Sequence, residues 1–445
     1  MSARRNVLRD LLREAGRRWR VAELEGRLAS GRSHTPGGVR TEAAGTALSR
    51  IAGALERVQR APPATIVVPI HNAPDEVKAC IDSLFRHTPD AHRIFLMEDA
   101  SHDPRVEEVL AKCANRANLE IHRSNRNLGF TRTVNRAIDL ADRSDVLLLN
   151  SDTEVTPRWM ENLRLAAYSG DRVATATPLS NNAGAFSAPE PEKENKLPHW
   201  LGRDDFSRLV TRSSSRTYPH VPTGNGFCMY IRRDAIDRIG SFDANAFPVG
   251  YGEENDFCMR ALHDGWGHVV DDATIIYHVR SASFGDARGE LLKRGRAVLD
   301  ARYPDYTGRV RAFARDPALR AVRERIAIVL ADCVASREPV APRLLLAWTD
   351  WDSRAQAHAA GWEPLLLRRA ESSLELLAIS GAGAEVLERI AWPPKSGDES
   401  AGGATVLATW LALYAVENVY FFGAKAESEA LCAACARLNI PLTST

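Results

Sequence analysis

The sequence predicts an α/β protein whose main domain is a mixed, mainly parallel sheet flanked by helices. Short apolar strand patterns alternate with helical patterns from residue 65 to residue 149, and polar clusters follow three of the strands. Such alternation is typical of parallel strands joined by right-handed crossovers. A shorter alternation begins near residue 343. The sequence therefore also predicts a second, smaller α/β domain at the C-terminus and, before the main domain, a helical N-terminal extension.

The composition indicates a globular protein with two or three domains. The 445 residues are 44% hydrophobic and carry a formal net charge of +1. This supports a sizeable core and gives no general attraction to nucleic acid. The seven cysteines, an odd number in a chain with no recognisable signal peptide, favour a reducing compartment, so we expect a cytoplasmic protein. No apolar run approaches the ~18 to 20 residues of a membrane-spanning helix.

Residues 1–62 form a basic segment with two helical patterns. The first 60 residues contain 13 arginines, 6 acidic residues and no lysine. Basic amphipathic helices bind anionic membrane surfaces, so one interpretation is peripheral contact with the inner face of a membrane or with a partner. The other interpretation is an ordinary helical extension that packs on the main domain. The pattern alone leaves both open.

The main domain is predicted over residues 63–310 and begins with four strands separated by three helices. Unbroken apolar runs are typical of strands buried on both faces, and apolar residues at three- and four-residue spacing indicate amphipathic helices. The predicted strands are Ile66–Ile70, Ile94–Met97, Leu119–His122 and Val146–Leu149, and the predicted helices are one from Pro74, then Val106–Cys113 and Thr131–Leu140.

Polar loops follow three of these strands, at His71–Asn72, Glu98–Ser101 and Asn150–Asp152. The carboxyl ends of parallel strands meet at one edge of the sheet, where open α/β sheets bind ligands. A carboxylate there could hold a divalent cation, which could in turn hold a diphosphate. The alternative for the third loop alone is a simple turn in which Asp152 caps the next helix. Three converging loops favour a binding site.

The sequence contains neither a phosphate-loop motif nor a G-x-G-x-x-G turn after the first strand. This argues against P-loop NTPases and dinucleotide-binding dehydrogenases. Residues 178–222 show little regular pattern and are rich in Pro, Ser, Asn and charge. A loop of this length within a compact domain is usually functional or disordered. An acceptor-binding lid and a plain mobile insertion are both open.

Three acids follow a glycine-rich turn at the predicted start of a helix: Glu253, Glu254 and Asp256. Acids at a helix start complement the helix dipole, yet three are more than capping requires. A carboxylate that faces the cleft could act as a general base. Further along, a strand pattern over residues 274–277 ends at His278, and a histidine at a strand end can be a metal ligand.

The C-terminal third is predicted as a helix and linker over residues 311–342 and a small Rossmann-like domain over residues 343–445. The helix is Pro317–Ala331, with Asp316 as its cap. The small domain shows no cofactor fingerprint. Cys432 and Cys435 form a C-x-x-C within a helix; without a second pair, helix packing is favoured over zinc. Protein interaction or acceptor docking is the expected role.

In their order and spacing, the motifs of residues 65–285 resemble glycosyltransferase family 2, whose members have the GT-A nucleotide-diphospho-sugar transferase fold. The matching segments are T-I-V-V-P-I-H-N at the first strand, E-D-A-S-H-D where the family usually has D-D-G-S-x-D, N-L-G-F at residues 127–130, N-S-D-T-E at the D-x-D position, G-N-G-F-C-M at residues 224–229, and G-E-E-N-D-F-C-M-R from residue 252.

The resemblance implies roles for individual residues. Glu98 and Asp99 match the acidic pair that contacts the base and ribose of the sugar nucleotide. Asp152 matches the last acid of the D-x-D motif, which binds Mg2+ or Mn2+ on the diphosphate, and His278 resembles the histidine that completes the metal shell. The other residues expected at the donor site are Pro69, Asn127, Gly129 and Asn150.

Glu254 aligns with the acid that the family uses as catalytic base, and Asp256 with the second acid of that motif. Two departures stand out. Asn150 replaces the first acid of the D-x-D motif, and Glu254 replaces the usual aspartate, which places the carboxylate about one methylene further out. Whether Glu253, Glu254 or Asp256 takes the proton therefore stays open at the level of sequence.

The reaction implied by the resemblance is inverting transfer of a sugar from a nucleotide-diphosphate donor to a hydroxyl of a glycan or lipid-linked acceptor, in cell-surface polysaccharide synthesis. Such a displacement needs no covalent intermediate, so Cys228 and Cys258 are expected to be core residues. The alternative is a non-catalytic scaffold that binds sugar nucleotides or glycans. The expected partners are the donor and acceptor, with a further protein partner for the C-terminal domain.

Overall fold

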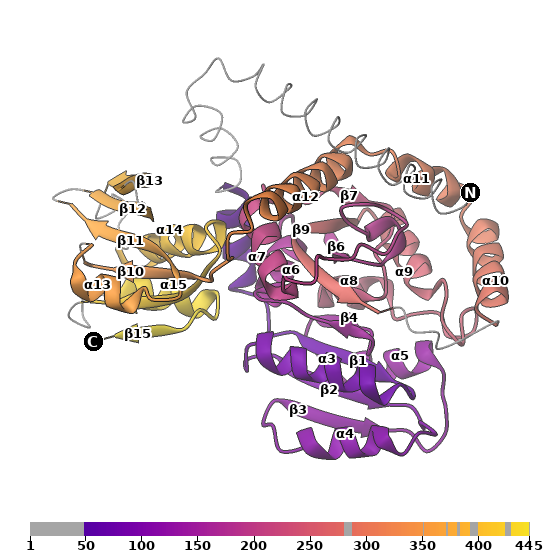
Figure 1. Cartoon of the computed structure of the whole chain (residues 1–445). Coiled ribbons are helices and arrows are strands. Elements are labelled where there is room, and N and C mark those ends of the chain that lie inside the picture. Colours follow the sequence, from indigo (N-terminus) through magenta and orange to yellow (C-terminus); the bar gives the residue numbers. More distant parts are fainter. Residues whose placement is uncertain are drawn as a thin grey trace, which may run out of the picture. The chain divides into compact units, whose positions relative to one another are not determined.

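A computed structural model describes residues 49–279, 287–349, 351–370, 373–380, 383–391, 399–422 and 429–444. These residues form one nine-stranded and one six-stranded sheet, which Figure 1 shows with their helices. The predicted mixed α/β fold is therefore confirmed. The predicted basic extension over residues 1–62 lies largely outside the described residues, which begin in a helix that continues through residue 58.

The large sheet is mixed, and most of its strands run in one direction. Strand β1 pairs in parallel with β2 and with β4, whereas β8 pairs antiparallel with both β4 and β6. The order across the sheet is β3-β2-β1-β4-β8-β6-β9-β5, with β7 also beside β9. The strands are β1 (Thr65–Ile70), β2 (Arg93–Glu98), β3 (Leu119–Arg123), β4 (Val146–Leu149), β5 (Thr153–Glu154), β6 (Val173–Ser180), β7 (His220–Val221), β8 (Cys228–Ile231) and β9 (Gly267–His278).

Helices cover both faces of this sheet because its central strands are apolar on both sides. Ile66 and Val68 of β1 pack in one core cluster with residues of α3 and α4, while Val67 packs in a second cluster with residues of α5 and α9. The helices of this part of the chain are α3 (Pro74–His87), α4 (Arg105–Cys113), α5 (Phe130–Leu140), α6 (Trp159–Ala167), the short 3-10 helix η1 (Gly184–Phe186), α7 (Arg203–Ser213), α8 (Arg233–Ile239), α9 (Glu253–His263), α10 (Ala287–Arg302), α11 (Tyr306–Phe313) and α12 (Pro317–Ser336).

Residues 178–222 contain more regular structure than the sequence predicted. Strand β6 continues to Ser180, and α7 is an eleven-residue helix that buries Phe206 and Val210. Thr211 of α7 donates a hydrogen bond to the carbonyl oxygen of Ala273 in β9 at 2.7 Å. The prediction of a long irregular loop is therefore wrong for this helix, which is packed on the sheet. Glu154 of β5 forms an ion pair with Arg203 at the start of α7.

Strand β9 is longer than predicted because its acids are buried and paired. Asp272 is fully buried, and it accepts hydrogen bonds from the Ser214 hydroxyl at 2.8 Å and the Arg325 guanidinium at 3.0 Å. Asp271 beside it is also fully buried, and burial raises its pKa to about 6. The acids interrupt the apolar pattern, so the sequence indicated only residues 274–277 as strand.

The second sheet lies in the C-terminal region and has the order β13-β12-β11-β10-β14-β15. Strands β10, β11, β14 and β15 run parallel to one another, and β12 and β13 add an antiparallel hairpin beside β11. The predicted limits of the domains stay predictions. The elements are β10 (Arg343–Ala347), α13 (Ser353–His358), β11 (Glu363–Arg369), β12 (Ser373–Ser380), β13 (Gly383–Ala391), α14 (Glu399–Leu413), β14 (Val416–Phe421), α15 (Glu429–Arg437) and β15 (Leu442–Ser444).

Arginines of α7 connect the large sheet to the C-terminal region. Arg208 forms an ion pair with Glu417 of β14 at 2.9 Å, and Arg212 forms one with Glu363 of β11 at 2.7 Å. The predicted cap of α12 is confirmed, since Asp316 accepts hydrogen bonds from two backbone N–H groups of its first turn. In the described part of the chain, no helix is both long and apolar enough for a membrane span.

Candidate active site

The carboxyl ends of β1, β2 and β4 lie along one edge of the large sheet. In the parallel register Ile70 lies opposite Glu98, and Val67 lies opposite Leu148. The backbone N–H of Asp99 donates a hydrogen bond to the carbonyl oxygen of Ile70 at 2.9 Å. Because strands that run in the same direction end at the same edge, the three polar loops predicted from the sequence are neighbours.

Asp99 joins the loop after β2 to the start of α5. Its carboxylate oxygens accept hydrogen bonds from the backbone N–H groups of Leu128 at 2.8 Å and Gly129 at 3.0 Å. His71 Nδ1 lies 2.9 Å from the Asp99 carbonyl oxygen and donates to it, so His71 Nε2 can accept the hydrogen bond from Asn127 Nδ2 at 3.3 Å. The structure thus brings together three predicted donor-site residues: Asp99, Asn127 and Gly129.

Glu98 and Pro69 support the same edge from within the strands. The Glu98 carboxylate accepts hydrogen bonds from the backbone N–H groups of Ala100 at 3.2 Å and Ser101 at 2.6 Å. Pro69 lies in β1 opposite Met97 of β2. In this structure Glu98 therefore shapes the loop after β2, because both of its oxygens accept hydrogen bonds from that loop.

Gly129 allows a close approach between the start of α5 and the segment before α9. Its φ is +81°, and a Cβ atom at this position would lie 2.6 Å from the carbonyl oxygen of Pro248. The hydroxyl of Thr131, the second residue of α5, donates to the carbonyl oxygen of Phe247. These contacts hold the segment that carries Glu253 and Glu254 against the loop that Asp99 fixes.

Replacing Gly129 by alanine should therefore lower the free energy of unfolding by more than the same replacement at a glycine that has a positive φ but no close neighbour. Gly240 has a similar φ of +85° but no atom within 4 Å of its Cβ position, so Gly240→Ala is the matched control. We expect Gly129→Ala to cost about 2 kcal/mol more than the control, because a new atom would overlap the backbone. Urea unfolding measures both. Equal costs would mean that the segment around Pro248 moves freely.

Asp152 and His278 form the second cluster of the site. Thr153 of β5 pairs with His278 at the end of β9, and His278 Nε2 lies 3.2 Å from Asp152 Oδ1. His278 Nδ1 donates to the carbonyl oxygen of Asn182 at 3.1 Å, which leaves Nε2 as an acceptor when the ring is neutral. Phe227 stacks on the ring with centroids 5.4 Å apart. Two acceptors at this distance require a proton or a cation between them.

The pair offers one carboxylate oxygen, which Mg2+ and Mn2+ both take, and one imidazole nitrogen, which suits a transition-metal ion better than Mg2+. Within the described ranges no three His, Cys, Asp or Glu residues are grouped to hold a metal ion. Asp152 and His278 therefore fit a cation that takes its other ligands from phosphate oxygens and water, as Mg2+ commonly does. The backbone of Asn150 completes the turn, since its carbonyl oxygen accepts from the Thr153 hydroxyl at 2.6 Å.

Glu253 and Glu254 begin α9, and they differ in what their oxygens contact. Glu253 Oε2 accepts a hydrogen bond from the backbone N–H of Gly252 at 3.1 Å. Glu254 Oε2 is buried and has no hydrogen-bond partner among the described residues. Burial raises the pKa of both carboxyls, and for Glu253 the charge of Glu254 adds to the effect, so its pKa lies well above the usual value. The two carboxyls therefore differ in that Glu254, among the described residues, keeps one oxygen that accepts no hydrogen bond.

Asp256 is fully buried and lies in a network of hydrogen bonds. Its Oδ1 accepts from Arg302 at 2.8 Å and from the Tyr303 hydroxyl at 2.8 Å, and its Oδ2 accepts from Arg260 at 2.9 Å. These partners come from α9 itself and from the end of α10. Both carboxylate oxygens are occupied, which suits a group that holds α9 in place.

The loop before β8 connects the two clusters. A Cβ atom at Gly226 would lie 3.9 Å from Glu254 Cδ, so the loop passes directly beside this carboxyl. The next residue, Phe227, stacks on His278, and its carbonyl oxygen accepts the backbone N–H of Asn150 at 2.9 Å. Gly226 of this loop thus lies beside the Glu254 carboxyl, and the next residue, Phe227, contacts His278. The short segment 224–227 therefore lies between Glu254 and the Asp152–His278 pair.

No role was predicted from the sequence for Asn182, Phe227, Arg302 or Tyr303. Asn182 lies in a segment predicted as an irregular loop, and Arg302 and Tyr303 lie about 50 residues after the acid they bind. Phe227 is part of the G-N-G-F-C-M motif, which was the available signal. Cys228 and Cys258 are fully buried, as predicted, and burial raises the pKa of the Cys258 thiol to about 12.

Residues 65–240 match the model of the family described as Glycosyl transferase family 2. The match includes β1 to β8 and the loops that carry Asp99, Asn127 and Asp152. Over this segment the chain is similar to glycosyl transferase family 2, and the resemblance predicted from its motifs is confirmed.

Two curated relatives are similar over part of their length. One is an uncharacterized glycosyltransferase, YibD, of Escherichia coli (strain K12), 30% identical over 24% of this chain and 31% of its own. The other is a putative glycosyltransferase, EpsH, of Bacillus subtilis (strain 168), 31% identical over 25% of this chain and 33% of its own. The chain thus spans about a third of the length of these relatives.

Solved structures show a weak likeness. A mannosyltransferase from Pyrobaculum calidifontis, in complex with GDP-Man and Mn2+, is 15% identical and has a TM-score of 0.40, with 67% of this chain and 86% of that chain covered. At this score the likeness carries no functional information. The mixed sheet order of the chain and its family match support the assignment of the fold.

Proposed function

We propose that this protein is an inverting glycosyltransferase that transfers a sugar from a nucleotide-diphosphate donor to a hydroxyl of a glycan or lipid-linked acceptor, in cell-surface polysaccharide synthesis. One observation carries the proposal. A buried carboxylate with an unpartnered oxygen, on Glu254, lies beside the same short loop that packs on the Asp152–His278 pair. Glu254 on one side of the loop can act as a base, and the Asp152–His278 pair on the other side can bind a diphosphate. This arrangement suits displacement of the diphosphate from a carbon atom between them.

The donor side consists of the loops after β1, β2 and β4. Glu98, Asp99 and Asn127 give this edge its shape through hydrogen bonds to the backbone, as described above. We assign the nucleoside to the surface made by these loops together with Pro69, Gly129 and Asn150. Because Asp99 already accepts two backbone N–H groups, it would contact a ribose hydroxyl through the remaining lone pairs of its oxygens.

Asp152 and His278 would hold Mg2+ or Mn2+. When bound, such an ion neutralises the negative charge that grows on a departing diphosphate. The protein itself prepares this position in two ways. The Asn182 carbonyl oxygen fixes the ring tautomer of His278 so that Nε2 presents its lone pair, and the Phe227 ring covers one face of the imidazole.

Glu254 would remove the proton from the acceptor hydroxyl while that oxygen attacks the anomeric carbon. The new carbon–oxygen bond forms as the bond from that carbon to the diphosphate breaks, so configuration inverts and no covalent intermediate arises. The pKa of Glu254 is raised by burial, which brings the carboxylate closer to the basicity that proton transfer near neutral pH requires. Glu253 and Asp256 would hold the start of α9 in position.

Replacement of Asp152 by alanine should remove cation-dependent donor binding. The first step is a thermal-shift screen of nucleoside diphosphates and sugar nucleotides with Mn2+, since a ligand bound only by the folded state raises the melting temperature. With a donor that binds, we expect Asp152→Ala to lose the Mn2+-dependent part of the shift and to lower hydrolysis or transfer about 100-fold or more.

Glu154→Gln is the matched control, because Glu154 lies two residues away and contacts Arg203 on the other side. It should keep both binding and turnover. Nucleotide binding without turnover of any donor would instead favour a non-catalytic sugar-nucleotide scaffold. The cytoplasmic location, the membrane contact of the N-terminal helices and the protein partner of the C-terminal domain stay predictions.

A further inference from the structure

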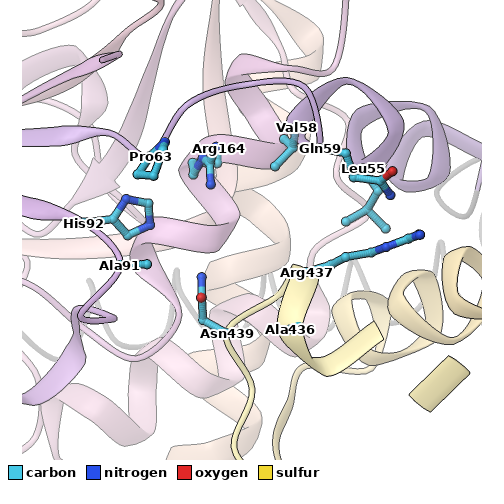
Figure 2. Close-up of a pocket in the computed structure, with 10 residues that line it drawn as sticks. All are labelled: Leu55, Val58, Gln59, Pro63, Ala91, His92, Arg164, Ala436, Arg437 and Asn439. Atoms are coloured by element: carbon cyan, nitrogen blue, oxygen red, sulfur yellow. The ribbon is translucent and has the colours of Figure 1, made fainter. Parts of the chain in front are cut away.

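A cavity of about 320 Å3 lies at the opposite edge of the large sheet from the candidate active site. It is formed at the amino ends of β1 and β2, where Pro63 and His92 precede the strands, and α6 contributes Arg164. Arg437 at the end of α15 closes it from the C-terminal region. Figure 2 shows these residues around the cavity, with Leu55 and Val58 on the helix that precedes β1.

A buried histidine presents an unused donor to this cavity. His92 is only 1% exposed, and its Nδ1 accepts a hydrogen bond from the backbone N–H of Ala64 at 3.1 Å. Burial and the nearby charge of Arg164 lower the pKa of His92 to about 3, so the ring is neutral and its proton lies on Nε2. His92 Nε2 is buried and has no hydrogen-bond partner within the described part of the chain.

Two guanidinium groups line the same cavity. Arg164 donates from Nη2 to the carbonyl oxygen of Pro62 at 3.0 Å, and its Nε is buried without a partner in the described ranges. Arg437 donates to the Thr405 hydroxyl at 2.7 Å, and the side-chain oxygen of Gln59, in the amide orientation that satisfies both groups, accepts from it at 2.8 Å. These partners are neutral, and the described lining contains no acidic residue. No acidic side chain of the described lining therefore neutralises the two guanidinium groups, and Glu161 of α6, which interacts electrostatically with Arg164, lies outside the lining.

We propose that this cavity binds a small phosphorylated organic compound at a site separate from the active site. A phosphate can accept hydrogen bonds from several donors at once, and guanidinium groups match its geometry. The His92, Arg164 and Arg437 donors supply these partners, while Leu55, Val58 and Pro63 provide an apolar wall for a short carbon skeleton. The volume lies at the lower end of the range for ligand sites, which excludes a sugar nucleotide. The inference does not depend on the proposed transferase activity.

Glycerol 3-phosphate is the probe, with inorganic phosphate and glycerol as comparisons, in calorimetry on the full chain without divalent cations. We expect saturable binding of glycerol 3-phosphate, weaker binding of inorganic phosphate and none of glycerol. Arg437→Gln should weaken binding of glycerol 3-phosphate about 10- to 100-fold, because it removes a charge-assisted hydrogen bond. The melting temperature without ligand shows whether each variant is folded.

Arg60→Gln is the matched control. Arg60 is exposed, lies beside the same helix and outside the lining, and its replacement removes the same charge; binding should be unchanged. As a second test, Ala436→Trp would fill the cavity from an exposed position and should abolish binding. Absence of binding by the phosphate probes, binding that survives both cavity variants, or an equal loss in Arg60→Gln would overturn the proposal.

Discussion

Replacing Glu254 by glutamine is expected to lower kcat by about 100- to 10,000-fold, the usual contribution of a general base. The amide keeps the size of the side chain and cannot take the proton from an acceptor hydroxyl. Donor binding, measured by thermal shift, should stay near that of the unchanged protein, since the Asp152–His278 pair is intact. The measurement is turnover at saturating donor and acceptor.

Glu253→Gln is the matched variant, because Glu253 is the neighbouring buried carboxyl whose oxygen is bonded to Gly252. It should keep activity within about tenfold. The base works only when it is deprotonated. The raised pKa of Glu254 therefore also predicts that, as the pH is lowered, kcat/KM begins to fall at a higher pH than an ordinary glutamate would give. Loss of activity in Glu253→Gln with retention in Glu254→Gln would reverse the assignment.

Replacing Asp256 by asparagine is expected to lower the free energy of unfolding by about 3 kcal/mol. The change removes the negative charge that two arginines and a tyrosine share, and loss of one partner in a buried ion pair usually costs 3 to 5 kcal/mol. We choose the lower end because Arg260 and Arg302 are partly exposed, at 28% and 39%. Thermal unfolding should show a decrease of about 6 to 12 °C.

Asp300→Asn gives the comparison on α10, the helix that carries Arg302. Asp300 pairs with Arg296 at the surface, with both side chains more than 40% exposed, and such pairs contribute at most about 1 kcal/mol. A melting temperature for Asp256→Asn close to that of Asp300→Asn would contradict the structural role. If Asp256→Asn stays folded and loses activity as completely as Glu254→Gln, Asp256 would be the base instead.

The strands and helices around the donor side could be predicted because their signals are local. Strands β1, β2 and β4 are short apolar runs that end in polar residues, β3 alternates apolar and polar residues, and each helix between them repeats apolar residues at helical spacing. The bounds differ by one residue or so because hydrogen bonding, and not hydropathy, determines where a strand ends.

Structure that depends on distant partners was missed. In α7 the buried Phe206 and Val210 are four residues apart, which is helical spacing. The serines and charged residues around them led to the prediction of an irregular loop. In β9 the acids Asp271 and Asp272 interrupt the apolar pattern of the strand. The partners that satisfy Asp272 are distant in sequence, since Arg325 lies more than 50 residues away and Ser214 comes from a different segment. No local pattern contains those partners.

The candidate site shows the same limit. The motifs indicated Asp152, His278 and the three acids of α9, and the structure brings Asp152 and His278 within 3.2 Å. Sequence could not distinguish Glu254 from Asp256, because the difference lies in the partners of Asp256. Arg302 and Tyr303 bind its Oδ1, and Arg260 binds its Oδ2. The roles of these residues at an active site stay predictions until the variants are measured.

The reversed direction of β8 has a consequence for the order in which the chain is synthesised. Strand β4 gains its second neighbour only when residues 228–231 have left the ribosome, long after β1, β2 and β3 are complete. Until then the four leucine and valine residues of β4 expose an unpaired strand edge, the kind of surface to which other chains add. The nascent chain thus completes β1 to β4 first and gives β4 its second neighbour only with β8, the strand whose preceding loop lies beside Glu254.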